Sequence, residues 1–120
     1  MSLIDRLSGL WGGIIDSVSF DVVQHTAQLA IRLVEGGNTR HVRLTFSGIS
    51  DFRFTNPNAG RYGWDYAELT EIHCNFQPDE SVLTEIVMWE ESSQLVVQSL
   101  LVDLEDVPAD PAHGLEIDLH

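Results

Sequence analysis

The sequence contains no lysine, and its six arginines face 19 acidic residues, which gives a formal net charge of −13. The imbalance lies in one half of the chain. Residues 1–61 hold five acids and all six arginines, whereas residues 62–120 hold fourteen acids and no basic residue apart from histidine. Proteins bind nucleic acids and anionic membranes through lysine and arginine, so neither is an expected partner. The same charge would steer a basic protein toward this chain.

Cysteine, proline and long apolar runs are also scarce. The single Cys74 excludes an internal disulfide and a cysteine-rich metal site, which fits a reducing compartment. No apolar run approaches the roughly 18 residues of a membrane span. Residues 1–13 lack a basic leader followed by an apolar stretch, so we expect no signal peptide and a cytoplasmic location. The 120 residues are expected to form a single domain, 1–120.

Hydrophobic alternation dominates what is present and predicts an all-β fold. Apolar residues at helical spacing over 3–11 predict one short N-terminal helix, with Ser2 as its N-cap. Gly36 and Gly37 mark a tight turn between two alternating segments, the strongest hairpin signal in the chain. Strands are predicted over residues 14–23, 27–34, 41–46, 49–54, the second half of 66–76, 82–89, 95–104 and 114–119. This pattern predicts an antiparallel β-sandwich or roll of about seven to eight strands.

The last 26 residues need separate interpretation because they are rich in carboxylates. The apolar run 95–104 predicts a long strand in the middle of a sheet. Residues 105–112 read as an acidic turn stiffened by prolines, since proline cannot donate to a central ladder. Residues 114–119 then alternate again and predict a final strand with Leu115, Ile117 and Leu119 buried.

Motifs for catalysis or cofactor binding are missing from the sequence. It has no G-x-S-x-G elbow, P-loop or dinucleotide fingerprint. The acids between Asp103 and Asp110 lack the order of a calcium loop and are better explained as a solvated turn. The five histidines show no metal-ligand spacing, and Cys74 in an alternating segment suggests a small buried side chain. We therefore expect no enzymatic activity, metal or cofactor.

Aromatic residues beside acids suggest a protein-binding surface instead. Tyr62, Trp64 and Tyr66 surround Asp65 in or beside a turn-rich loop, where Tyr62 and Trp64 could act as anchors for arginine and lysine side chains. The competing interpretation is that Trp64 and Trp89 plug the ends of the core. Around the two anchors we expect a rim of acids, formed by Glu90, Glu91, Asp103, Glu105 and Asp106.

Several segments together resemble a known family. The order "WGGIIDSVSFD", a glycine-rich hairpin, "VRLTFSGISDFRF" and "VLTEIVMWE" is similar to the small all-β bacterial YxiG-like and related immunity-type proteins. Trp11, Asp16 and Phe20 would occupy the entry pattern of that group, although Ile15 replaces the histidine of its His-Asp pair. The resemblance covers roughly residues 11–105 and implies a meandering sheet that neutralises a toxin from neighbouring cells.

The leading hypothesis is therefore a non-enzymatic acidic domain that binds a basic protein, as an immunity protein blocks a toxin. One alternative is a small structural or accessory domain, a homodimer through an edge strand, whose acidity serves only solubility. Another is a calcium-dependent module, which would melt at a higher temperature when calcium is added.

Overall fold

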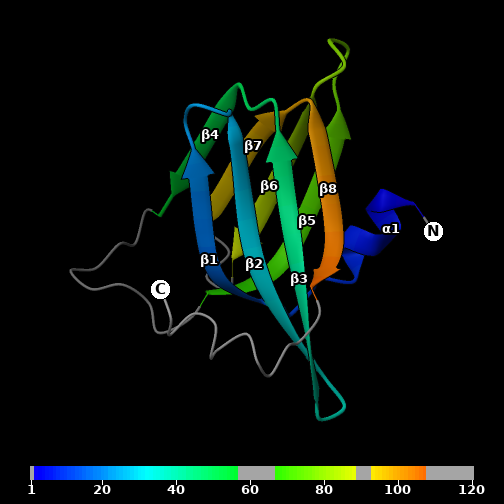
Figure 1. Ribbon diagram of the computed structural model, residues 1–120. Helices are drawn as coiled ribbons and strands as arrows, with labels where there is room; N and C mark the ends of the chain where they lie inside the picture. The colour runs from blue at the N-terminus through cyan, green and yellow to red at the C-terminus, as the bar shows by residue number, and fades with distance from the viewer. Residues whose placement is uncertain (1, 57–66, 89–92, 108–120) are drawn as a thin grey trace.

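The computed structural model describes residues 2–56, 67–88 and 93–107, which form one short helix and eight strands (Figure 1). The predicted all-β antiparallel fold with an N-terminal helix is confirmed. The elements are α1 Leu3–Ser8, β1 Ile14–Asp21, β2 Thr26–Glu35, β3 Asn38–Ser47, β4 Asp51–Thr55, β5 Ala67–Phe76, β6 Val82–Met88, β7 Gln94–Ser99 and β8 Leu101–Val107.

All eight strands belong to one antiparallel sheet with the order β4-β7-β6-β5-β1-β2-β3-β8. The sheet folds over on itself (Figure 1), so that β1, β2, β3 and β8 form a front half and β4, β7, β6 and β5 a back half. The halves join through β1 and β5, which share the pairs Ile14–Glu68 and Ile15–Ala67 among the described residues. The result is an open roll whose edge strands are β4 and β8.

The core lies between the two halves and follows the alternation of the strands. In β2 the buried residues are Ala27, Leu29, Ile31 and Leu33, and each neighbour between them points outward. The largest fully buried side chain is Phe46 on β3. Stacking the two inner faces in this way removes the apolar side chains of both halves from water.

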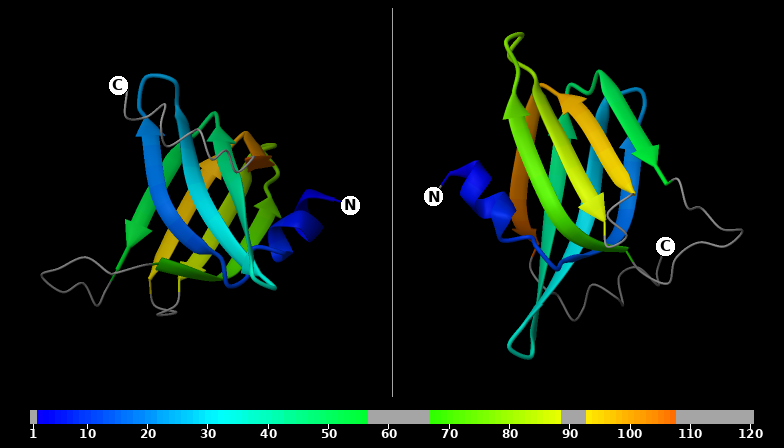
Figure 2. Two further views of the ribbon diagram at one scale, coloured as in Figure 1. Left: turned by 60° about the horizontal axis from the view of Figure 1, so that its bottom comes forward. Right: turned by 180° about the vertical axis from the view of Figure 1, so that it is seen from behind.

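Helix α1 lies against one side of the roll, beside β5 and β8 (Figure 2). A capping box between Ser2 and Asp5 begins the helix, and Leu7 is buried against the core. Arg6 donates a hydrogen bond to the backbone carbonyl of Leu104 on β8. The helix therefore covers one side of the core, between β5 and β8, with Leu10 buried just after it.

The predicted central strand over 95–104 is wrong, because the run is divided between β7 and β8. At Leu100 the chain crosses from the back half to the front half, and its backbone N–H donates to the carbonyls of Ser47 and Gly48. Gly48 has a φ of +68°, and a Cβ there would lie 2.9 Å from the Leu100 side chain. The close approach requires glycine. After the crossing, β8 pairs with β3 and lies at the edge of the sheet.

Two further boundaries differ from the prediction. Residues 66–76 form a strand from Ala67 onward instead of only in their second half, because a bulge between Leu69 and Glu71 interrupts the alternation. Glu105 and Asp106 lie within β8, not in an acidic turn, because their strand pairs with β3. Val107 also belongs to β8, whereas residues 108–112 of that predicted turn and the predicted strand 114–119 lie outside the described residues.

Candidate functional site

Five of the eight residues predicted to bind a partner lie outside the described residues: Tyr62, Trp64, Asp65, Glu90 and Glu91. The described residues on either side of them are informative. Segment 57–66 connects β4 to β5, and segment 89–92 connects β6 to β7. The Ser93 hydroxyl donates to Oδ1 of Asn56 over 3.0 Å, so the flanks of the two segments are hydrogen-bonded to each other.

The other three predicted residues lie on β8, and they do not form one acidic rim. Glu105 accepts from Arg43 with an N–O distance of 2.6 Å, and Asp106 accepts from Arg40 at 2.8 Å. Strand alternation directs Asp103 and Glu105 to the same face and Asp106 to the opposite one. Asp103 has no ion pair among the described residues. Two of the three carboxylates are thus already neutralised by β3.

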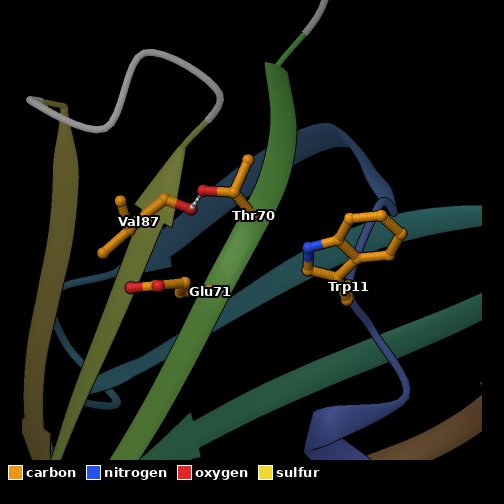
Figure 3. A pocket seen from close by; sticks show the side chains of 4 residues that line it. All are labelled: Trp11, Thr70, Glu71 and Val87. Carbon is orange, nitrogen blue, oxygen red and sulfur yellow. Dashed lines mark hydrogen bonds between the residues drawn. The ribbon is translucent and has the colours of Figure 1, made fainter.

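An aromatic residue beside a carboxylate occurs elsewhere, at a hollow next to β5. The described residues that line it are Trp11, Thr70, Glu71 and Val87, and its volume is about 530 Å³ (Figure 3). A neighbouring hollow of about 190 Å³ shares three of these residues and continues along β5 to His73. The Trp11 side chain is 72% exposed, the most exposed large aromatic side chain among the described residues.

Backbone hydrogen bonds fix Trp11 beside β5. The segment between α1 and β1 forms two hydrogen bonds with Leu69. The Gly12 N–H donates to the Leu69 carbonyl, and the Leu69 N–H donates to the Gly13 carbonyl, each over 2.7 Å. Gly12 adopts a φ of +81°. A Cβ at Gly13 would come within 2.8 Å of Ile31. The two glycines therefore allow the backbone next to Trp11 to lie against β5.

Glu71 stands at the other side of the hollow, directly after the β5 bulge. One of its oxygens lies 3.3 Å from Nε2 of His73, and no arginine pairs with it among the described residues. The Thr70 hydroxyl donates to the Val87 carbonyl over 3.0 Å, which ties the floor of the hollow to β6 (Figure 3). The site thus combines an exposed indole with a carboxylate that pairs with no arginine in the described part of the chain.

This pairing of groups suits a positively charged side chain. A cation over an indole face gains about 0.5–2 kcal/mol, and a carboxylate adds charge-assisted hydrogen bonds. We call Trp11, Thr70, Glu71 and Val87 the Trp11 hollow. Sequence reasoning missed it because the spacing of residues 3–11 assigns Trp11 to the apolar face of a helix. Helix α1 ends at Ser8, so the indole is free to point outward.

Metal-binding and nucleophilic groups are not assembled in the part of the chain described. No cluster of three or more His, Cys, Asp or Glu side chains that could hold a metal occurs there. Cys74 is half-buried on the inner side of β5, with its Sγ 3.3 Å from the Thr84 hydroxyl. Burial raises the pKa of the Cys74 thiol, opposed in part by the hydrogen bond with Thr84. A raised pKa disfavours the nucleophilic thiolate.

Alkylation of Cys74 tests whether its thiol is unreactive in the native protein. With iodoacetamide at about pH 8, the native protein should react at least tenfold more slowly than a free thiol, because the thiolate is scarce and shielded. In denaturant the difference should vanish. Mass spectrometry against time measures both rates. Equal rates in the native and denatured states would show an accessible, reactive cysteine.

A family model described as YxiG-like protein matches residues 3–99, a span that contains the Trp11 hollow and ends within β7. No curated protein matches the chain. Among the described residues, no helix has the length and apolar character needed to cross a bilayer.

Proposed function

Since this chain belongs to the YxiG-like protein family, with Trp11 and Glu71 inside the matched region, we propose that it is a non-enzymatic acidic domain that binds a basic protein. The biological role we propose is that of an immunity protein, which neutralises a basic toxin domain in the cytoplasm. The observation that carries the proposal is the Trp11 hollow, which is lined both by an exposed indole and by a carboxylate that pairs with no arginine among the described residues.

The distribution of ion pairs supports this proposal. Arginines on β2, β3 and β4 are already paired with acids of this chain: Arg32 with Asp16, Arg40 with Glu35 and Asp106, Arg43 with Glu105, and Arg53 with Asp51. In the described part of the back half, Glu71, Asp79, Glu80 and Glu85 pair with no arginine. Negative charge on that half is therefore available to a partner.

In the proposed complex an arginine or lysine of the partner enters the Trp11 hollow. Its charged group stacks on the indole, and the Glu71 carboxylate accepts its hydrogen bonds. Arginine is the better fit, because its planar guanidinium can stack and form two parallel hydrogen bonds at once. Because Gly12 and Gly13 are hydrogen-bonded to Leu69, the backbone next to Trp11 does not have to be ordered on binding.

Salt should slow formation of this complex. A basic protein captured from native cell extract at low ionic strength provides the partner, and stopped-flow fluorescence gives both rate constants. We expect association to slow at least about tenfold between 20 and 500 mM salt, with a smaller change in dissociation, because long-range steering is screened. Capture of no basic protein, or an association rate indifferent to salt, would contradict the proposal.

Toxin neutralisation needs its own test. A basic toxin domain encoded beside this gene is expressed from an inducible promoter, with and without this protein, and cell growth is followed. Co-expression should restore growth, and the E71Q variant should restore less. Full protection by a W11A/E71Q double variant would leave the Trp11 hollow without a role.

A further inference from the structure

The outer face of the back half continues the surface on which the Trp11 hollow lies. None of the described elements covers β5, β6 and β7 on this side (Figure 2). On β6 the side chains of Thr84, Ile86 and Met88 are buried, whereas the residues between them point outward and are half-buried. Val87 is one of these outward residues and also lines the hollow. The hollow is thus one margin of a solvent-facing sheet.

A second carboxylate lies on this face, close to the hollow. In the β5–β6 register Glu71 is opposite Val87, and His73 is opposite Glu85. The four side chains form a square with the two carboxylates at diagonal corners, where Cβ atoms are about 7–8 Å apart. The Glu71 side chain also extends from β5 toward β6 (Figure 3). Glu71 and Glu85 therefore belong to one surface.

Glu85 forms no ion pair among the described residues. The described arginine of the back half is Arg53 on β4, and its guanidinium lies 2.9 Å from the Asp51 carboxylate. In the sheet Arg53 is opposite Val96, which is opposite Glu85. Two strand spacings, about 10 Å in all, therefore separate the backbones of Arg53 and Glu85. Within the part of the chain that the structure describes, the Glu85 carboxylate is available to a partner.

Charge determines which partner suits this face. The half-buried side chains of Val87 and Val96 lie beside the two carboxylates, so the face offers apolar contact together with negative charge. A second copy of this chain would place carboxylates against carboxylates, and nucleic acids or anionic membranes would be repelled in the same way. A basic protein surface complements both features.

We propose that the binding surface extends from the Trp11 hollow to Glu85, and that the basic partner places an extended segment with two cationic side chains there. The first cation enters the hollow and pairs with Glu71. The second, two residues further along the segment, pairs with Glu85. This extension rests on the proposed function and specifies which kind of segment the hollow recognises.

The spacing of the two carboxylates favours an extended segment. In a strand, residues i and i+2 point to the same side about 6.6 Å apart, and residue i+1 points away from the surface. Helical residues i and i+4 are closer, about 5–6 Å apart between Cβ atoms, and residues two turns apart are about 11 Å apart. His73 does not block the site. Its Nε2 lies 3.3 Å from one Glu71 oxygen, and a carboxylate can accept from a second donor at the same time.

Two variants with the same change in charge test the role of Glu85. With the captured basic protein at about 150 mM salt, E85Q should weaken binding at least about fivefold, because a contact carboxylate is lost. The matched control is E80Q, since Glu80 lies in the turn between β5 and β6, in the same half. Both variants lose equal long-range attraction, so E80Q should weaken binding less than about twofold. Isothermal titration gives the affinities, and urea unfolding verifies that both variants are folded.

A double-mutant cycle distinguishes two cations from one. If separate side chains of the partner pair with Glu71 and Glu85, the fold-losses of E71Q and E85Q should multiply to within about a factor of two. A double variant that binds no more weakly than E71Q alone would mean that a single cation is shared by both carboxylates. That result would overturn the two-cation segment.

Synthetic peptides test the segment without the captured protein. The probe is the blocked peptide Gly-Arg-Val-Arg-Gly, and its control replaces the second arginine with alanine. In titrations of the full-length protein followed by NMR, the amide signals of Glu71, His73 and Glu85 should shift, and the probe should bind at least about fivefold more tightly than its control. With E85Q the two peptides should bind alike. Equal affinities for the unsubstituted protein would overturn the extension to Glu85.

Failure of the extension and failure of the proposed function give different results. If W11A and E71Q weaken binding of the captured protein while E85Q behaves like E80Q, the surface ends at the Trp11 hollow. The extension is then overturned and the proposed function stands. If no basic protein is captured, or if W11A and E71Q bind it normally, the proposed function fails and the extension fails with it.

Discussion

Replacing Phe46 with alanine is expected to lower the free energy of unfolding by about 3–5 kcal/mol. Phe46 is fully buried on β3, where it pairs with Ala27 of β2 and Val102 of β8. Its ring fills the space between the halves of the roll, and a small neighbour such as Ala27 cannot expand into the cavity. Urea unfolding followed by circular dichroism measures the loss.

The matched control for F46A is F76A. Phe76 is also a strand phenylalanine, but its side chain is 65% exposed at the end of β5. Its removal should cost about 0.5 kcal/mol or less. A domain of this size has about 5–15 kcal/mol of stability in total, so the milder F46L serves if F46A does not fold. Similar losses for F46A and F76A would contradict the packing described.

Removing the indole of Trp11 should weaken binding of a basic partner about 10- to 100-fold. Interface tryptophans are often responsible for 2 kcal/mol or more of binding energy, and here the ring also attracts the cation. Because the Trp11 side chain is 72% exposed, W11A should leave unfolding almost unchanged. Isothermal titration with the captured partner, beside urea unfolding of the same variants, separates the two effects.

Three further variants make the test of Trp11 specific. W11F keeps an aromatic face and should retain most of the affinity, whereas E71Q removes the charge and should lose about tenfold. If one cation contacts both groups, the losses of W11A and E71Q should be non-additive in a double-mutant cycle. F76A removes an exposed aromatic on another part of the surface and should bind normally. Equal losses for W11A and F76A would contradict a role for the hollow.

The elements that local patterns determine were predictable from the sequence. The hairpin around Gly36 and Gly37 has its turn chemistry and its alternation in consecutive residues, and the structure places β2 and β3 there. The division of the run 95–104 into two strands was not predictable from the sequence. The change of direction at Leu100 depends on a close approach to Gly48, about fifty residues earlier in the chain. Nothing in an apolar run marks such a crossing.

The location of the candidate site was even harder to predict from local sequence patterns. The idea of an aromatic residue beside acids came from composition, but its location did not. The exposure of Trp11 follows from a helix that ends three residues early and from hydrogen bonds to Leu69, both of which depend on contacts across the fold. Similarly, the pairing of Glu105 with Arg43 depends on strand register between distant segments, which no local pattern specifies.

The position of β8 also affects how the chain folds during synthesis. Arg40 and Arg43 on β3 leave the ribosome about sixty residues before Asp106 and Glu105, the acids that pair with them. Until β8 emerges, the nascent protein presents β3 as an open edge lined with positive charge. Such non-local pairings form late and slowly. The finished protein is strongly acidic, but the nascent chain made up of residues 1–61 is close to neutral. Before β8 has been synthesised, the nascent chain is most exposed to unwanted strand pairing.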